Sequence, residues 1–172
     1  MIFGDISNFN NVSDYLPILN GCLNADLFII LLSQHNFISS KYLKNWYKKF
    51  NLAAVIIDFL ILVIGIIITR FFYKYFFQEF NIWKFIAIAL CVQIIYDNLF
   101  YIFVKNIPLG YNYMLDFFKE YAKELGYKAI IGDSFAMIIS CLLSSYFKTF
   151  TINTNIIGLV LSLYFIPYAI NY

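Results

Sequence analysis

Apolar residues form long blocks along this chain, and charged residues stand at the borders of these blocks. Three blocks are bounded by basic residues, from Lys49 to Arg70, from Lys84 to Lys105 and from Lys128 to Lys148. Each block has about the 20 residues that an α-helix needs to cross the hydrocarbon core of a bilayer. No charge follows Lys148, and the last segment is again long enough to span. We therefore predict an all-α membrane protein with a four-helix transmembrane bundle, its spans at about residues 50–70, 83–105, 129–148 and 153–171.

The first 49 residues are harder to assign because their apolar run is short. Residues 27–32 (LFIILL) are strongly apolar, but polar residues flank them closely on both sides. Short runs of this kind are more often interfacial or buried segments than spans. We predict that residues 1–49 form an N-terminal interfacial and amphipathic region, including an interfacial helix, and that residues 50–171 form the transmembrane bundle. The alternative is a fifth span over about residues 16–34.

Lysines and aromatic residues are interleaved in residues 40–50, SKYLKNWYKKF. Aromatic rings favour the headgroup level of a membrane, and lysines favour its anionic phosphates. Trp46, Tyr47, Lys48 and Lys49 are therefore predicted to anchor the chain at the membrane interface. Because lipid phosphates account for this basic patch, it does not indicate a nucleic-acid partner.

A second amphipathic segment lies between the second and third predicted spans. From Met114 to Tyr121 apolar residues recur at helical spacing, and charged residues occupy the opposite face. Gly126 stands where such a helix would end. We predict an amphipathic surface helix over residues 111–125, which either lies on the membrane or docks a partner protein.

The composition agrees with a membrane protein. Hydrophobic residues make up 62% of the chain and charged residues only 13%, whereas a soluble domain has about a quarter charged residues. The net charge of +2 is too small to indicate a nucleic-acid-binding face. No nucleophile, metal-ligand or phosphate-loop motif occurs in the sequence. We predict no enzyme activity, no catalytic residues, no metal and no cofactor.

Basic residues are divided unequally between the two sides of a four-span bundle. One side carries both termini and eight basic residues: Lys41, Lys44, Lys48, Lys49, Lys105, Lys119, Lys123 and Lys128. The other side carries four: Arg70, Lys74, Lys84 and Lys148. Because cytoplasmic loops are enriched in lysine and arginine, both termini are predicted on the cytoplasmic side. The glycosylation sequon at Asn11 would change sides if a fifth span existed.

Each of the first three predicted spans contains a single charged residue, and each time it is an aspartate: Asp58, Asp97 or Asp133. Charges in mid-membrane are costly, so they tend to face the bundle interior and to mark function or specific pairing. At 1.5 Å per residue, the three aspartates lie ~13, ~12 and ~7 Å from the same predicted membrane boundary. We expect three carboxylates from three helices to share one leaflet.

Polar residues accompany these acids on the same helix faces: Gln93 and Tyr101 near Asp97, and Ser140 beyond Asp133. Three interpretations stay open for this intramembrane polar site. The acids are protonated or hydrogen-bonded and set the helix register, or they form a proton or cation site. A hydrolytic metal centre is the least favoured, because the only histidine, His35, is distant in sequence.

Small and hydroxyl residues also form a stripe on each predicted span. Helices in membranes place such residues against each other, because close backbone approach and interhelical hydrogen bonds replace the hydrophobic driving force. The stripes therefore predict a polar seam inside the bundle. Their members include Ala54, Gly65, Thr69, Ala89, Ser144, Asn155, Gly158 and Ser162.

Three acid-bearing segments carry a resemblance to a known family: LKNWYKKFNLAAVIIDFLILVIGI, VQIIYDNLFYIFVKNIPLGYN and FFKEYAKELGYKAIIGDSFAMI. They resemble a family of uncharacterised multi-pass membrane proteins of nucleocytoplasmic large DNA viruses, the giant viruses, over about residues 43–145. The resemblance implies no activity. It implies recurrence of Asp58, Asp97, Asn112, Tyr121, Gly132 and Asp133, with Tyr96 where a histidine would be sought.

A structural or assembly role in a viral or host membrane is the function that we expect from these features. The membrane would be the inner membrane of a virion or a membrane of the host. The expected partners are the lipid bilayer, a capsid or scaffold protein, or further copies of the chain. The alternative is a proton or cation channel or transporter subunit that uses Asp58, Asp97 and Asp133.

Overall fold

The structure, a computed structural model, describes residues 2–35, 37 and 41–171, and all regular elements in these residues are helical. The predicted all-α bundle is therefore confirmed. A 3₁₀ helix, η1, spans Val12–Asp14. The α-helices are α1 (Tyr15–Gln34), α2 (Lys41–Phe50), α3 (Leu52–Phe76), α4 (Ile82–Asn106), α5 (Tyr113–Leu125), α6 (Tyr127–Phe147) and α7 (Ile152–Ile170).

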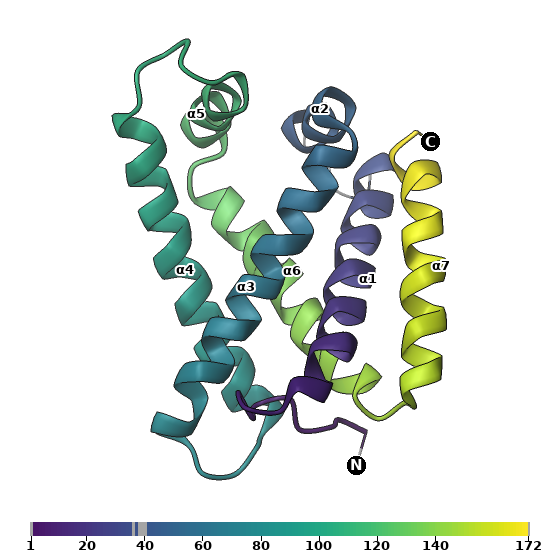
Figure 1. Cartoon of the computed structure of the whole chain (residues 1–172). Helices are drawn as coiled ribbons and strands as arrows, with labels where there is room; N and C mark the ends of the chain where they lie inside the picture. Colours follow the sequence, from purple (N-terminus) through teal and green to yellow (C-terminus); the bar gives the residue numbers. More distant parts are fainter. Residues whose placement is uncertain (1, 36, 38–40, 172) are drawn as a thin grey trace.

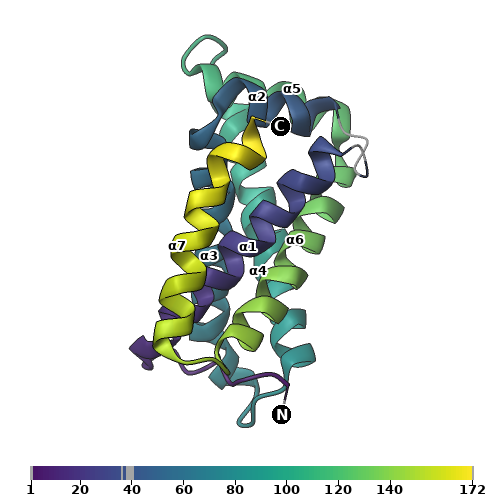
Figure 2. The same ribbon diagram turned by 90° about the vertical axis from the view of Figure 1, so that its right-hand side faces the viewer.

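Five of these helices, α1, α3, α4, α6 and α7, are long and apolar enough to cross a membrane. They run between the two ends of the bundle, while α2 and α5 lie across one end (Figures 1 and 2). We call the end covered by α2 and α5 the cap end. The opposite end, which carries residues 2–14, is the strap end.

Helix α1 corrects the prediction for the N-terminal region, because it lies inside the bundle and not on a membrane surface. It contacts α3, α6 and α7, and eleven of its twenty residues are buried. Hydropathy identifies helices whose side chains face lipid. Helix α1 is surrounded by other helices, so its polar side chains can form hydrogen bonds inside the bundle. The amide of Asn20, for example, donates to the Oδ1 atom of Asn155 in α7 at 3.3 Å. The alternative of a fifth span describes this helix better.

The small-residue stripes of α6 and α7 meet α1. A Cβ atom on Gly21 would collide with the backbone of Ser144 in α6, and one on Gly158 in α7 would collide with Asn20. The predicted polar seam thus has α1 at its centre. Other members of the stripes are also buried: Ala54, Gly65, Thr69, Ala89, Asn155 and Ser162.

The cap helices pack on each other through aromatic rings. Trp46 of α2 stacks on Phe117 of α5 with ring centroids 5.6 Å apart, and its ring lies 4.8 Å from that of Phe118. Trp46 and Tyr47 are only 4% and 1% exposed. The prediction that both rings sit among lipid headgroups is therefore corrected: they are interior residues. Lys48 and Lys49, the other two predicted anchors, are exposed.

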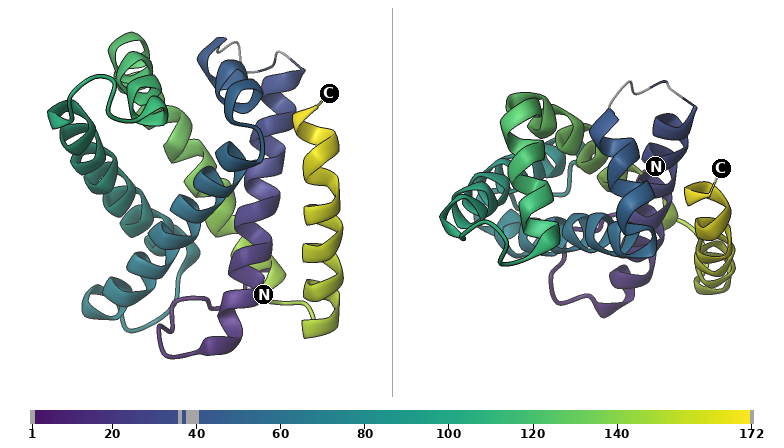
Figure 3. Two further views of the ribbon diagram at one scale, coloured as in Figure 1. Left: turned by 45° about the horizontal axis from the view of Figure 1, so that its top comes forward. Right: turned by 90° about the horizontal axis from the view of Figure 1, so that it is seen from above.

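Helix α4 packs closely along its first half only. Most of its buried residues lie between Ile82 and Gln93, and Val104 is the one that lies beyond them. Toward the cap end α4 leans away from α3 (Figures 1 and 3).

The two ends of the chain lie at opposite ends of the bundle (Figure 1). Residues 2–14 are at the strap end, and α7 finishes at the cap end. Five membrane crossings, the number that helix length and apolarity allow, would leave these two ends on opposite faces of a membrane. The prediction of two termini on the cytoplasmic side does not fit this arrangement, because it assumed an even number of spans.

Candidate functional site: an acidic cluster beneath the cap

Asp58 is held by the cap helix α2. The indole Nε1 of Trp46 donates a hydrogen bond to its Oδ2 atom at 2.8 Å, and the Asp58 side chain is half-buried in α3. A predicted interface anchor and a predicted intramembrane acid therefore form one contact. Because Trp46 also packs on Phe117, this contact ties α2, α3 and α5 together.

Asp26 of α1 is a fourth acid, and sequence reasoning did not single it out. It is 2% exposed, and the Tyr47 hydroxyl donates to its Oδ1 atom at 3.4 Å. Its Oδ2 atom is buried and has no hydrogen-bond partner among the described residues. The sequence does contain a feature that marks this residue. Asp26 is the only charged residue in α1, just as Asp58, Asp97 and Asp133 are single charges within their predicted spans. The apolar run beside it, residues 27–32, is too short to indicate a span, so the sequence alone does not place Asp26 within a membrane.

Tyr47 lies between Asp26 and Asp58. Burial raises the pKa of its phenol, the negative charges of Asp58 and Asp26 raise it further, and hydrogen bonds to both carboxylates act in the same direction. The phenol is therefore protonated at neutral pH and acts as a donor. The hydroxyl donates to Asp26 and lies close to Asp58.

Asp97 accepts a hydrogen bond from a residue of its own helix, α4. The side-chain amide of Gln93 donates to the Oδ2 atom of Asp97, and Ser134 of α6 donates to the Gln93 carbonyl at 2.8 Å. Gln93 is fully buried. This short chain of hydrogen bonds connects α4 to α6 at the level where α4 begins to lean away.

Asp133 has a different environment from the other acids. It falls on the inward stripe of α6, because Met137, Ser140 and Ser144 follow at four, seven and eleven residues and are all buried. Asp133 itself is exposed, and no described residue donates a hydrogen bond to it. Asp133 is thus an exposed residue on the inward stripe of α6, next to the contact of Ser134 with α4.

Tyr121 shows that the three predicted aspartates gather beneath α5. Burial raises the pKa of its phenol, and the charges of Asp133, Asp58 and Asp97 add to this effect, in that order of importance. The phenol therefore lies within electrostatic range of all three carboxylates. In the described part of the chain, however, no three His, Cys, Asp or Glu side chains are close enough to hold a metal ion.

Two residues that the sequence placed in the polar site stand apart from it. Ser140 is buried, but its hydroxyl donates to the Ala136 carbonyl of its own helix at 2.8 Å. Tyr101 is half exposed on the part of α4 that leans away. Gln93 is the only predicted companion that contacts an acid.

An apolar core separates the acidic cluster from the strap end. Its buried members include Cys22 of α1, Ile66 of α3, Phe85 of α4 and Met137 of α6. Each of these is 0% exposed. The acidic cluster thus lies between this core and the cap helices α2 and α5.

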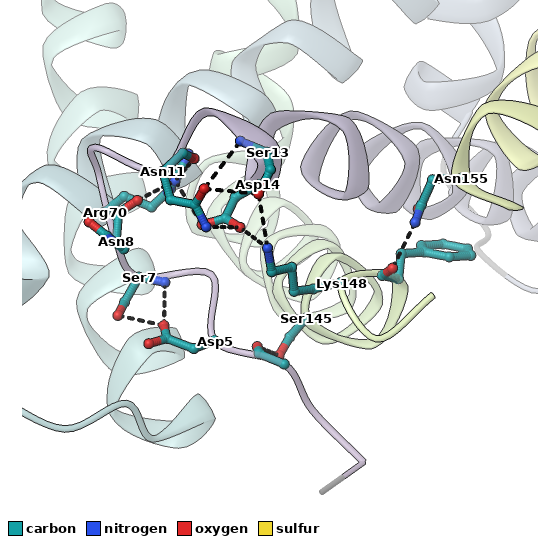
Figure 4. A network of polar contacts seen from close by, with 12 residues as sticks. Asp5, Ser7, Asn8, Asn11, Ser13, Asp14, Arg70, Ser145, Lys148 and Asn155 are labelled. Carbon is teal, nitrogen blue, oxygen red and sulfur yellow. Dashed lines mark hydrogen bonds and ion pairs between the residues drawn. The ribbon is translucent and has the colours of Figure 1, made fainter. Parts of the chain in front are cut away.

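The strap end carries a second polar network, which sequence reasoning missed (Figure 4). Asp14 and Arg70 are fully buried and form an ion pair of 3.0 Å, and Lys148 pairs with the other Asp14 oxygen. Arg70 also donates to the carbonyls of Asn8 and Asn11 at 2.5 and 2.9 Å. These contacts hold residues 2–14 against α3 and α6. From the sequence, Arg70 is expected only as a charge at the border of an apolar block.

In comparisons with known proteins, no family model, no curated protein and no solved structure matches this chain. Its function is therefore inferred from the geometry of its own residues.

Proposed function

We propose that this integral membrane protein has a structural or assembly role and that the cap end is its contact surface. The observation that carries the proposal is the platform made by α2 and α5, two amphipathic helices that lie across the bundle end and pack on each other (Figure 3). Trp46, Tyr47 and Phe117 of these helices are buried, whereas most of their lysines are exposed. Exposed lysines at this end are Lys41, Lys48, Lys49, Lys105, Lys123 and Lys128.

The cap end faces the cytoplasm in this proposal. All eight basic residues of the richer side belong to the cap end, and the remaining four belong to the strap end. An excess of lysine and arginine is characteristic of cytoplasmic loops. The N-terminal strap then lies on the opposite face of the membrane. A basic platform on the cytoplasmic side fits an acidic face of a capsid or scaffold protein, in a viral membrane or a membrane of an infected host.

Site-specific cross-linking tests the assembly role. A photo-reactive residue at position 48, on the exposed face of α2, is compared with one at position 84, an exposed lysine of the strap end. We expect protein adducts of defined mass from position 48 only, in virions or infected cells. They should fall at least about tenfold in a Lys41→Glu, Lys123→Glu variant, because the attraction is between opposite charges. Adducts with lipid alone, or equal protein adducts from both positions, contradict the proposal.

Passage of protons or cations through the acidic cluster is a second candidate function. The observation that favours it is Asp133, an accessible and unpaired carboxylate on an inward helix face. Purified protein in liposomes would be compared with the triple variant Asp58→Asn, Asp97→Asn, Asp133→Asn for proton and potassium flux. Flux that is lost in the variant supports this function. Absent or unchanged flux removes it.

A further inference from the structure

We propose that Asp26 and Asp58 form a proton-binding pair, with Tyr47 of the cap helix α2 as the bridge between the two carboxylates. The pair joins α1 and α3 directly beneath α2. It is independent of the assembly role proposed above and needs no transport across the membrane.

The count of hydrogen-bond donors supports a bound proton. The pair has four carboxylate oxygens, and the donors that reach them are the Trp46 indole and the Tyr47 hydroxyl. The Oδ2 atom of Asp26 is buried and has no donor among the described residues. Two negative charges with so few donors are strongly unfavourable in an apolar setting. One proton held by the pair removes one of these charges.

The surroundings of the pair add negative rather than positive charge. Asp133 in α6 and Asp97 in α4 are the other acids of the cluster, and Tyr121 in α5 is a neutral phenol near them. On α1 itself the nearest titratable neighbour is Cys22, which is fully buried, and α7 has no charged residue. Neighbouring acids favour proton retention, because they repel a second negative charge.

The lysines of α2 are engaged away from the pair. The Lys44 ammonium donates to the backbone carbonyl of Gln34 at 3.4 Å. The Lys49 ammonium lies 3.9 Å from the ring centroid of Tyr113 in α5. Lys41 and Lys48 are exposed. A lysine therefore does not take the place of the proton.

Trp46 provides a direct optical readout of the pair. The chain has two tryptophans, and Trp83 is 65% exposed in the first turn of α4, so Trp83→Phe leaves Trp46 as the single fluorophore. Its indole nitrogen is bonded to Asp58. In detergent or nanodiscs we expect the Trp46 emission to change in one transition as the pH is varied. The transition should lie between about pH 4 and pH 10, the ordinary pKa values of a carboxyl group and a phenol.

Three further variants in the Trp83→Phe background identify the groups that titrate. Asp26→Asn removes the repelling charge and should lower the midpoint by about one pH unit or more. Tyr47→Phe removes a donor to the ionised form and should raise it. Asp97→Asn is the matched control, an aspartate of the same cluster that is bonded to Gln93 and not to the pair, and it should shift the midpoint much less than Asp26→Asn does.

The two opposite shifts keep the test decisive if one variant does not fold. Folding is checked by size-exclusion chromatography and far-ultraviolet circular dichroism. If Asp26→Asn is misfolded, the midpoint of Tyr47→Phe decides. The absence of a Trp46 transition in the Trp83→Phe protein overturns the proposal. An unchanged midpoint in the folded Asp26→Asn or Tyr47→Phe variant also overturns it. Neither result depends on a binding partner or on flux.

Discussion

At the scale of single residues, the buried charges of the strap end are tolerated because each has a partner of opposite charge. Asp14 at the strap end has two cationic partners, Arg70 and Lys148, and both Asp14 and Arg70 are 0% exposed. The Nε and Nη1 atoms of Arg70 have no hydrogen-bond partner among the described residues. The Arg70 guanidinium lies 4.9 Å from the ring centroid of Tyr15, which offers a cation–π contact on one face. Asp14 therefore provides the counter-charge on which Arg70 depends.

We expect Asp14→Asn to destabilise the protein by about 3 kcal/mol, the cost of leaving a buried charge without its partner. The measurement is the thermal unfolding midpoint in a defined detergent, followed by circular dichroism. Asp5→Asn is the control, because Asp5 is exposed and accepts hydrogen bonds only from nearby Ser7. A similar loss of Tm in both variants would show that the strap does not depend on the ion pair.

At the scale of helices, the packing of α1 depends on close approach to α6. Gly21 lies against the backbone of Ser144, and the Ser144 hydroxyl donates to the Ile18 carbonyl at 3.4 Å. A side chain at position 21 would push the two helices apart. The closeness of these backbones makes α1 the centre of the bundle despite its polar residues.

Two glycine-to-alanine variants test this packing. Gly21→Ala should destabilise the protein by about 1–3 kcal/mol, because the added methyl group meets backbone and the helices must separate. Gly132→Ala in α6 has open space around the added Cβ, so it should be neutral or gain up to about 1 kcal/mol from helix propensity. Unfolding midpoints of the two purified variants give the comparison. Equal midpoints would contradict the close α1–α6 contact.

Helix α5 begins at a well-formed cap, which gives a further prediction at this scale. The side chain of Asn112 accepts hydrogen bonds from the backbone N–H groups of Met114 and Leu115 at 2.9 and 3.2 Å. Asn112→Ala should cost about 1 kcal/mol and fray the start of α5, whereas Asn112→Ser should retain the cap. Limited proteolysis of the α4–α5 connection should be faster in the alanine variant only. Equal cleavage of both variants would argue against the cap.

At the scale of the whole molecule, an odd number of crossing helices decides the topology. Helix α1 joins the bundle, so the strap end and the C-terminal end of α7 are on opposite sides (Figure 1). The division of basic residues between the two sides is the same as in a four-span arrangement, and only the N-terminal region changes side. The acidic cluster then lies nearer to the side with more lysines.

Glycosylation of added tags tests this topology. A flexible extension with a sequon is placed before Met1 in one variant and after Tyr172 in another, and each is expressed in a secretory system. We expect an endoglycosidase-sensitive mass shift for the N-terminal extension only, because our proposal places the cap end on the cytoplasmic side. The natural sequon is a poor reporter, since the Asn11 side chain already donates to Asp14 at 2.9 Å. Modification of both tags, or of the C-terminal tag alone, would contradict the topology.

Much of the architecture could be predicted because a bilayer imposes local rules. Backbone polar groups must be satisfied within each helix, and charges are costly, so long apolar blocks with border charges mark helices. The same rules marked Asp58, Asp97 and Asp133 as exceptional. The amphipathic segment that became α5 was also visible, because its periodicity and Gly126 are local features.

The tertiary structure alone decided which helix is central and which polar residues meet. The cost of Asn20 or Asp26 depends on whether lipid or another helix faces it, and no local pattern contains that information. For the same reason Trp46 and Tyr47, which suit a headgroup layer, instead cover Asp58 and Asp26. Local sequence determined where the helices lie, because lipid contact is a property of each helix by itself. Long-range packing determined the acidic site, because a hydrogen bond between helices exists only once both are in place.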